Sequence, residues 1–136
     1  MLKKNKLEFN HIGIFVKNIK KSEKYIDLFC EKKRNKIILD KSLGIKAKLY
    51  FDKKKICYEL IEPYGKKSPV NGCLKKQVNI LNHIAYKTYK FVDTINYLKN
   101  NNFLQITKIK YSKLFNSKIV FFLSPLKYII EIIEKK

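Results

Sequence analysis

The chain has two histidines, His11 and His83, and both lie in the same four-residue pattern, NHIG at residues 10–13 and NHIA at 82–85. The histidines are 72 residues apart (83 − 11), and Glu59 in YELIE and Glu131 in IEIIE are separated by the same distance (131 − 59). Imidazole nitrogens and carboxylate oxygens are ligands of divalent first-row metals. These four residues are therefore candidate ligands of one metal ion.

The 72-residue spacing extends beyond these four residues. Without a gap, NHIGIFVKNIKKSEKYIDLF lies over NHIAYKTYKFVDTINYLKNN, and LYF (49–51) lies over FFL (121–123). Identity between the two copies is low, but sparse polar residues coincide inside apolar runs. Such self-similarity indicates that one supersecondary unit occurs twice in the chain.

The apolar periodicity predicts the same elements in both copies, namely a strand, an amphipathic helix and three further strands. We expect a strand at 7–16, a helix at 19–32 and strands at 36–40, 44–51 and 55–62, then a strand at 80–87, a helix at 90–101 and strands at 103–110, 117–123 and 127–134. Residues 63–79, with two prolines and two glycines, are interpreted as a linker. The prediction is a single α+β domain over residues 1–136, in which two βαβββ modules (about 7–62 and about 80–134) form a cupped mixed sheet around a metal site.

The two glutamates are expected on apolar strand faces. Because side chains alternate along a strand, Glu59 shares a face with Cys57 and Ile61, and Glu131 has the same setting within IEIIE. A carboxylate on such a face is costly unless it is paired or bound to a metal. A histidine on a strand is on its own more often a core or surface residue than a ligand, so the metal hypothesis depends on all four residues repeating together. Glu62 and Glu134 also repeat, and we interpret them as solvent-facing charges at strand ends.

The net charge of +20 raises the possibility of a nucleic-acid partner, which the residue types do not support. Arg34 is the single arginine, although arginine is the usual bidentate reader of phosphates and base edges. The lysines are spread along the chain, as a general Lys/Asn/Ile bias would produce. Lys46, Lys48 and Lys118 flank the predicted strands and are candidates for meeting an anionic substrate, but solvated lysines are the more ordinary interpretation.

Other features of the sequence favour a cytoplasmic protein without a membrane partner. No apolar run approaches the roughly 20 residues of a membrane span. The basic start, MLKKNKLEFNH, leads into a strand-like run without a small-residue cleavage site, so no signal peptide is expected. Cys30, Cys57 and Cys73 are odd in number and lack metal-site spacing, so we expect reduced packing cysteines.

At the histidines and glutamates the chain resembles the vicinal oxygen chelate superfamily, the glyoxalase and bleomycin-resistance fold, and within it the methylmalonyl-CoA epimerases. The matching stretches are NHIGIFVKNIKKSEKYI, LGIKAKLYF, YELIEPYGKKSPV, LNHIAY and KIVFFLSPLKYIIEII. The resemblance implies one divalent metal ion (Co, Mn, Ni, Zn or Fe) held by His11, Glu59, His83 and Glu131. Superfamily members pair their modules within one chain or across a homodimer, and both arrangements suit this sequence.

The resemblance also implies a reaction. An epimerase of this kind removes the proton α to the acyl group of a small anionic substrate such as an acyl-CoA, passes through an enolate and returns a proton on the other face. Glu131 and Glu59 are the candidates for that proton transfer. Two alternatives remain: a glyoxalase-type lyase or a dioxygenase of the same superfamily, and a metal-free protein that sequesters a drug or another ligand.

Overall fold

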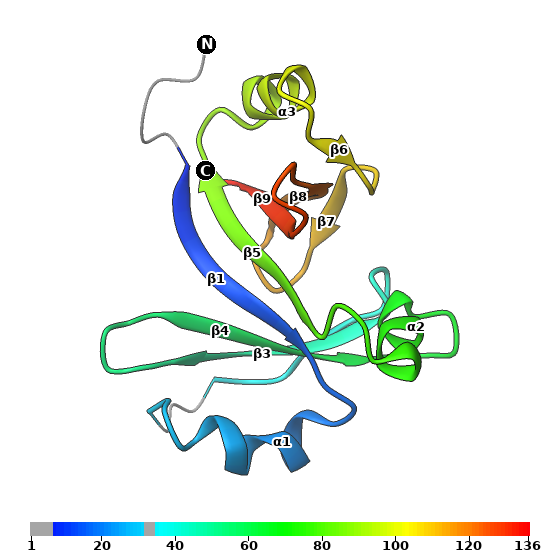
Figure 1. The fold of residues 1–136 in the computed structure, drawn as a ribbon. Coiled ribbons are helices and arrows are strands. Elements are labelled where there is room, and N and C mark those ends of the chain that lie inside the picture. The colour runs from blue at the N-terminus through cyan, green and yellow to red at the C-terminus, as the bar shows by residue number, and fades with distance from the viewer. Residues whose placement is uncertain (1–6, 32–34) are drawn as a thin grey trace. The chain divides into compact units, whose positions relative to one another are not determined.

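The computed structural model describes residues 7–31 and 35–136, and within these ranges the chain forms three helices and nine strands (Figure 1). The first six residues, which entered the signal-peptide prediction, and Arg34 lie outside the described residues. The chain divides into two compact units, one of residues 11–82 and one of residues 83–136 with the residues before 11. The predicted α+β class and the βαβββ order are confirmed, with one strand of the second half divided into two.

The first unit is built on a mixed sheet in the order β2-β3-β4-β1. Its elements are β1 (Glu8–Phe15, which begins in the other unit), α1 (Ile19–Ile26), β2 (Ile38–Asp40), β3 (Ile45–Phe51) and β4 (Cys57–Pro63). β3 is antiparallel to both of its neighbours, whereas β1 runs parallel to β4. Helix α1 lies along one face of this sheet (Figure 1), where Ile19 and Ile26 pack with Tyr50 and Leu60.

Helix α1 is shorter than predicted. Asn18 caps it by accepting a hydrogen bond from Lys21 N, and its last residue is Ile26. After that residue Leu28 N donates to Tyr25 O and Phe29 N donates to Ile26 O, and these i→i−3 bonds tighten the chain into a turn. Phe29, which the predicted helix at 19–32 would include, lies after its end and is 54% exposed. The predicted end of the helix at residue 32 lies outside the described residues.

The predicted linker contains a helix, α2 (Pro69–Lys76). Ser68 caps it, Pro69 occupies the first helical turn, and Gln77 ends it in the left-handed region with a φ of 55°. Proline suits this position because its fixed φ fits a helix and its missing N–H would have no partner in the first turn. The predicted linker therefore includes a helix that the sequence analysis did not predict, because Ser-Pro is a helix start as well as a turn signal.

The second unit repeats the arrangement, with the sheet order β5-β9-β8-β6 and with β7 paired to β8. Its elements are β5 (Leu81–Thr88), α3 (Phe91–Asn100), β6 (Leu104–Gln105), β7 (Lys110–Ser112), β8 (Ser117–Leu123) and β9 (Ile129–Glu134). The single strand predicted at 103–110 is split into β6 and β7. Between them the ladder is interrupted, because Phe121 N donates to the side chain of Thr107 instead of to a carbonyl.

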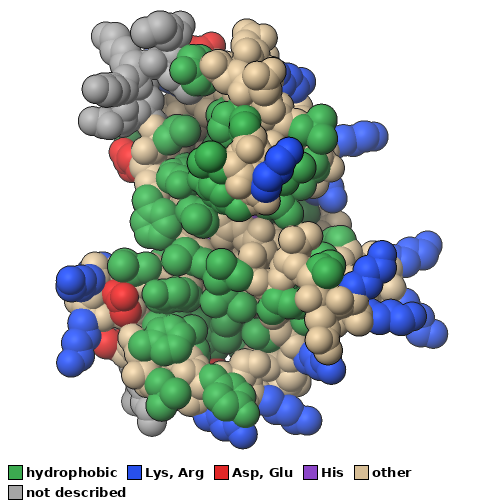
Figure 2. All heavy atoms as spheres, viewed as in Figure 1, with side chains coloured by type: hydrophobic (Ala, Val, Ile, Leu, Met, Phe, Trp, Pro, Cys, Tyr) green, Lys and Arg blue, Asp and Glu red, His purple; other side chains and the backbone are tan. Residues whose placement is uncertain are grey.

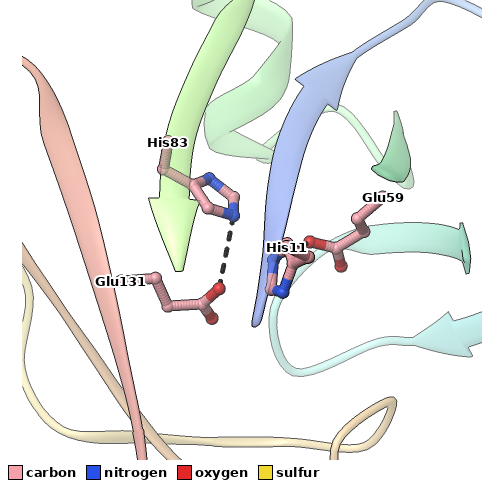
Figure 3. Close-up of side chains that lie close together, drawn as sticks. All are labelled: His11, Glu59, His83 and Glu131. Atoms are coloured by element: carbon pink, nitrogen blue, oxygen red, sulfur yellow. Dashed lines mark ion pairs between the residues drawn. The ribbon is translucent and has the colours of Figure 1, made fainter. Parts of the chain in front are cut away.

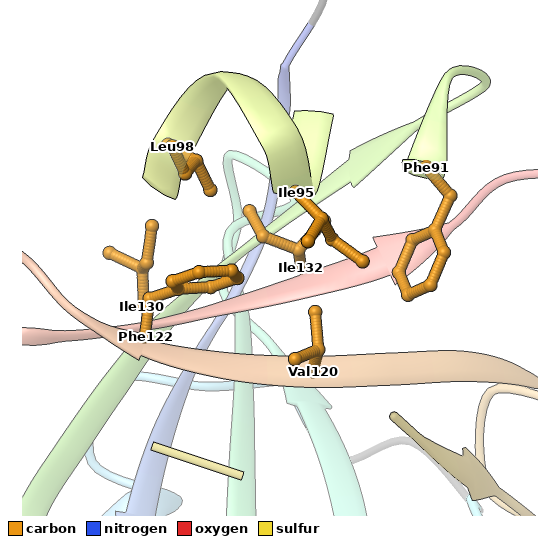
Figure 4. Packing of buried hydrophobic residues seen from close by; sticks show 7 residues of the cluster. All are labelled: Phe91, Ile95, Leu98, Val120, Phe122, Ile130 and Ile132. Carbon is orange, nitrogen blue, oxygen red and sulfur yellow. The ribbon is translucent and has the colours of Figure 1, made fainter. Parts of the chain in front are cut away.

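The core of the second unit lies between α3 and the sheet (Figure 4). Phe91, Ile95 and Leu98 of α3 face alternate residues of β8 and β9, namely Val120, Phe122, Ile130 and Ile132. Burying one such side chain contributes about 1.5–3 kcal/mol, so this cluster orients both strands firmly. By alternation, Phe121 and Glu131 are directed to the opposite face. None of the three helices in the described ranges is long and apolar enough to cross a membrane.

Candidate functional site

The first unit contains a buried His–Glu pair on its two parallel strands. His11 of β1 is 0% exposed and Glu59 of β4 is 4% exposed, and His11 Nε2 lies 2.9 Å from Glu59 Oε1. Cys57 and Ile61, which alternate with Glu59, are buried as well, so Glu59 is on the apolar face that the sequence predicts. The imidazole compensates a carboxylate that would be costly to bury alone.

The second unit contains the equivalent pair on β5 and β9. His83 is 4% exposed and Glu131 is 3% exposed. Figure 3 shows His83 directing Nε2 toward the carboxylate of Glu131, and the distance from Nε2 to Oε1 is 3.2 Å. Each predicted ligand is therefore buried beside a second predicted ligand from its own unit.

Small residues on the neighbouring strands give both glutamates their space. In the parallel ladders, Gly13 is in register with Glu59, and Ala85 is in register with Glu131. Partners in register project to the same face of a sheet, so a large side chain at either position would occupy the space beside the carboxylate. The G of NHIG and the A of NHIA are thus placed where a carboxylate needs room.

The donor set fits a divalent first-row metal. Each unit supplies one imidazole and one carboxylate from rigid strands, and all four residues are buried. Imidazole suits Zn, Cu, Fe and Ni, whereas carboxylate suits Mg and Mn. The chemistry of these side chains could therefore hold a metal.

Glu62 is not the solvent-facing charge that the sequence suggests. Its Oε1 accepts a hydrogen bond of 2.9 Å from Ile19 N at the start of α1, and its Oε2 lies 3.5 Å from Lys46 Nζ. An acidic group suits a helix N-terminus because the first N–H groups lack partners within the helix. Glu134, at the matching position of the second unit, is in register with Thr88. At the start of α3 the side-chain acceptor is Thr88 Oγ1, to which Lys90 N donates.

Lys46 and Lys48 lie on the α1 face of β3, and alternation therefore directs them away from the face of Glu59. Lys48 Nζ is 2.5 Å from Glu23 Oε1, to which Tyr50 also donates at 2.8 Å. The hydrogen bond from Lys48, and then that from Tyr50, lower the pKa of Glu23, whereas burial and the bond to Glu23 raise the pKa of the Tyr50 hydroxyl. Both lysines therefore form ion pairs on the α1 face, Lys48 with Glu23 and Lys46 with Glu62.

Lys118 also lies on the face of its strand that is directed away from Glu131, so it is badly placed to meet a substrate there. It alternates with Ile119 and so shares the α3 face of β8 with Val120. It is exposed. On the face drawn in Figure 2 lysine side chains project at several separate places and no histidine is visible, which agrees with the burial of both histidines. The ordinary interpretation, a solvated lysine, suits Lys118 better than a substrate contact.

Two residues that the sequence did not single out face the glutamates from the antiparallel strands. Leu49 of β3 is in register with Glu59, and Phe121 of β8 is in register with Glu131. Their positions differ by 72 (121 − 49), so the superposition of LYF on FFL was the available signal. Sequence alone did not identify them because apolar strand residues are expected in any core.

The strand order and the paired βαβββ modules define the fold of the vicinal oxygen chelate superfamily. Among solved structures, the methylmalonyl-CoA epimerase from Mycobacterium tuberculosis is similar, with a TM-score of 0.79 and 19% identity over 100% of this chain and 93% of that chain. The hypothetical protein BH1468 from Bacillus halodurans C-125 has a TM-score of 0.77 and 25% identity over 98% of this chain and 96% of that chain.

A third similar structure is a variant of Streptomyces coelicolor methylmalonyl-CoA epimerase in complex with 2-nitronate-propionyl-CoA. It has a TM-score of 0.72 and 15% identity over 94% of this chain and 96% of that chain. No family model and no curated protein sequence matches the chain. At these identities the likeness to the epimerases establishes the fold.

Proposed function

We propose that this protein is a metal-dependent epimerase or isomerase that moves a proton on the carbon α to an acyl group, with an acyl-CoA as the leading substrate class. The observation that carries the proposal is the buried His–Glu pair at the same place in each βαβββ module. Further support comes from the similar structures, which include a methylmalonyl-CoA epimerase in complex with methylmalonyl-CoA and NH4+.

In this proposal His11, Glu59, His83 and Glu131 together hold one divalent metal ion. The donor set supports this assignment, because two imidazoles and two carboxylates suit first-row metals such as Co, Mn, Ni, Zn or Fe. When bound, such an ion acts as a Lewis acid that stabilises negative charge developing on the substrate oxygens.

Glu131 and Glu59 are the proposed proton-transfer residues. A carboxylate has two oxygens, so Glu131 can keep Oε1 beside His83 Nε2 and receive a proton at Oε2. Glu59 has the matching arrangement with His11 and is proposed to return a proton on the other side of the enolate. Burial of both carboxylates strengthens their electrostatic effect on a developing charge.

The setting proposed for this activity is the cytoplasm, with no nucleic-acid or membrane partner. Cys30, Cys57 and Cys73 are odd in number and lack metal-site spacing, which agrees with a reducing compartment. Pairing of two copies into a homodimer is the remaining element of the proposal, and light scattering of the purified protein tests it.

The decisive experiment follows deuterium exchange at the α-carbon. Purified protein loaded with Co²⁺ or Mn²⁺ is incubated in D2O with methylmalonyl-CoA, with other 2-methylacyl-CoA esters and with 2-hydroxy acids, and incorporation is read by mass spectrometry. We expect exchange with at least one acyl-CoA. Because general acid–base groups contribute about 10²–10⁴-fold, Glu131→Gln should lower the rate by at least about 100-fold.

Glu134→Gln is the matched control, because it makes the same chemical change on the same strand at a residue outside the proposed site. It should leave the exchange rate unchanged. Absence of exchange with every substrate would refute the epimerase proposal. Unchanged exchange in a Glu131→Gln variant that still binds metal would exclude Glu131 as the base.

A further inference from the structure

Phe121 makes an aromatic contact with one of the proposed metal ligands. Its ring centroid is 5.1 Å from that of His83, and the two ring planes are inclined by 78°, an edge-to-face arrangement. Phe121 is also in register with Glu131, the carboxylate that lies beside His83 Nε2. One side chain therefore borders both members of the second His–Glu pair.

The backbone of Phe121 is held on both sides. On one side β8 pairs with β9. On the other, Phe121 N donates to Thr107 Oγ1 at 3.1 Å, and Phe121 O accepts a hydrogen bond of 3.0 Å from Ile106 N. A ring mounted on such a fixed strand can restrain its neighbour, whereas a ring on a loop would move with it.

The first unit has a comparable side-chain hydrogen bond to the matching strand residue, which is a leucine. Leu49 is in register with Glu59, and its carbonyl accepts a hydrogen bond of 2.9 Å from Asn35 Nδ2. Asn35 and Thr107 are 72 positions apart (107 − 35), as are Leu49 and Phe121 (121 − 49). A side-chain anchor on the strand recurs in both units, and of the two matched positions only 121 carries an aromatic ring.

We propose that Phe121 is a positioning residue for His83. Rotation about the last bond of a histidine side chain is broad and roughly two-fold, so packing must select the orientation that directs Nε2 toward Glu131. The His83 side chain is 2% exposed, and the Phe121 ring closes part of its surroundings edge to face. The consequence for metal affinity rests on the proposed function, whereas the consequence for ring orientation does not.

The first measurement is metal affinity in Phe121→Leu and Phe121→Tyr, by titration with Zn²⁺ and by the absorption spectrum with Co²⁺. An aromatic pair contributes about 1 kcal/mol, which corresponds to a factor of about five in a dissociation constant. We therefore expect Phe121→Leu to weaken binding about fivefold and to change the Co²⁺ spectrum. Phe121→Tyr retains the ring and should restore both.

The second measurement uses the fact that the chain has only two histidines. Selective labelling of histidine gives one NMR signal set for His83 and one for His11, which serves as an internal reference. In the metal-free protein, Phe121→Leu should shift and broaden the His83 ring signals and leave those of His11 in place.

Phe122→Leu is the matched control, because it removes the same ring one residue along the strand. Phe122 is 0% exposed and packs against α3, so the variant should lose stability without moving the His83 signals. Equal His83 shifts in both variants, or none in Phe121→Leu, would overturn the positioning role. A wild-type protein that binds no metal would refute the proposed function, and the metal-free spectra would still decide the role of Phe121.

Discussion

Substituting a histidine in either unit should remove most of the stabilisation that the metal gives, because we propose that each unit supplies half of one site. The test compares His11→Ala with His83→Ala. In the metal-free protein each change removes the imidazole beside a carboxylate that is 3–4% exposed. Breaking a buried pair in this way costs about 3–5 kcal/mol, so both variants should unfold at lower urea concentration.

The metal contribution can be worked out separately. At a free metal concentration 100 times the dissociation constant, binding adds about 2.7 kcal/mol to the free energy of unfolding. If loss of one ligand weakens binding about 100-fold, the same concentration adds only about 0.4 kcal/mol. The metal-induced gain should therefore nearly vanish in both variants.

The assay is urea unfolding followed by circular dichroism, with Co²⁺ or with EDTA, for the wild type and both variants. The difference between the two conditions cancels the cost of the substitution itself. A single four-ligand site predicts one metal ion per chain and an equal loss in both variants. If His83→Ala kept the full metal-induced gain, the ion would be held without the second unit and the four-ligand proposal would be wrong.

Two further predictions concern the surroundings of the site. Glu62→Ala should lower the free energy of unfolding by about 1 kcal/mol, because it removes the acceptor of Ile19 N at the start of α1. The control Glu134→Ala should lower it by less than about 0.5 kcal/mol. Equal urea midpoints for the two variants would contradict the capping role of Glu62. Because the pKa of Glu23 is lowered in the folded state, its stabilising effect is present above the ordinary value of 4.5 and is lost as pH falls through the lowered pKa. Glu23→Gln should therefore flatten the stability profile below that pH, and an unchanged acid limb would show that the bonds from Lys48 and Tyr50 do not set it.

The sequence determined the order of elements and the strand faces of the glutamates. Alternation alone placed Glu59 with Cys57 and Ile61, and all three are buried. It did not reveal that Leu60, on the other face, is also buried, at 3% exposure. Burial on the second face depends on where α1 packs, and that contact joins residues distant in the chain.

The errors in the sequence predictions have similar causes. The helix that begins at Ser68 and Pro69 was not predicted within the linker because serine and proline mark both turns and helix starts, and only the observed hydrogen bonds distinguish the two. The role of Glu62 could not be predicted because Ile19 lies 43 residues earlier in the chain. The pairing of Lys48 with Glu23 could not be predicted for the same reason. Strand periodicity gives the face on which a residue lies but not the residue that it contacts.

The chemical groups and their two-fold recurrence are therefore properties of the sequence, because residue type and spacing can be read without coordinates. The tertiary structure decided that each histidine lies within hydrogen-bonding distance of its own glutamate, since this requires two strands far apart in the chain to run parallel in one register. It also decided that Phe121, an ordinary apolar strand residue in the sequence, stands edge to face with His83.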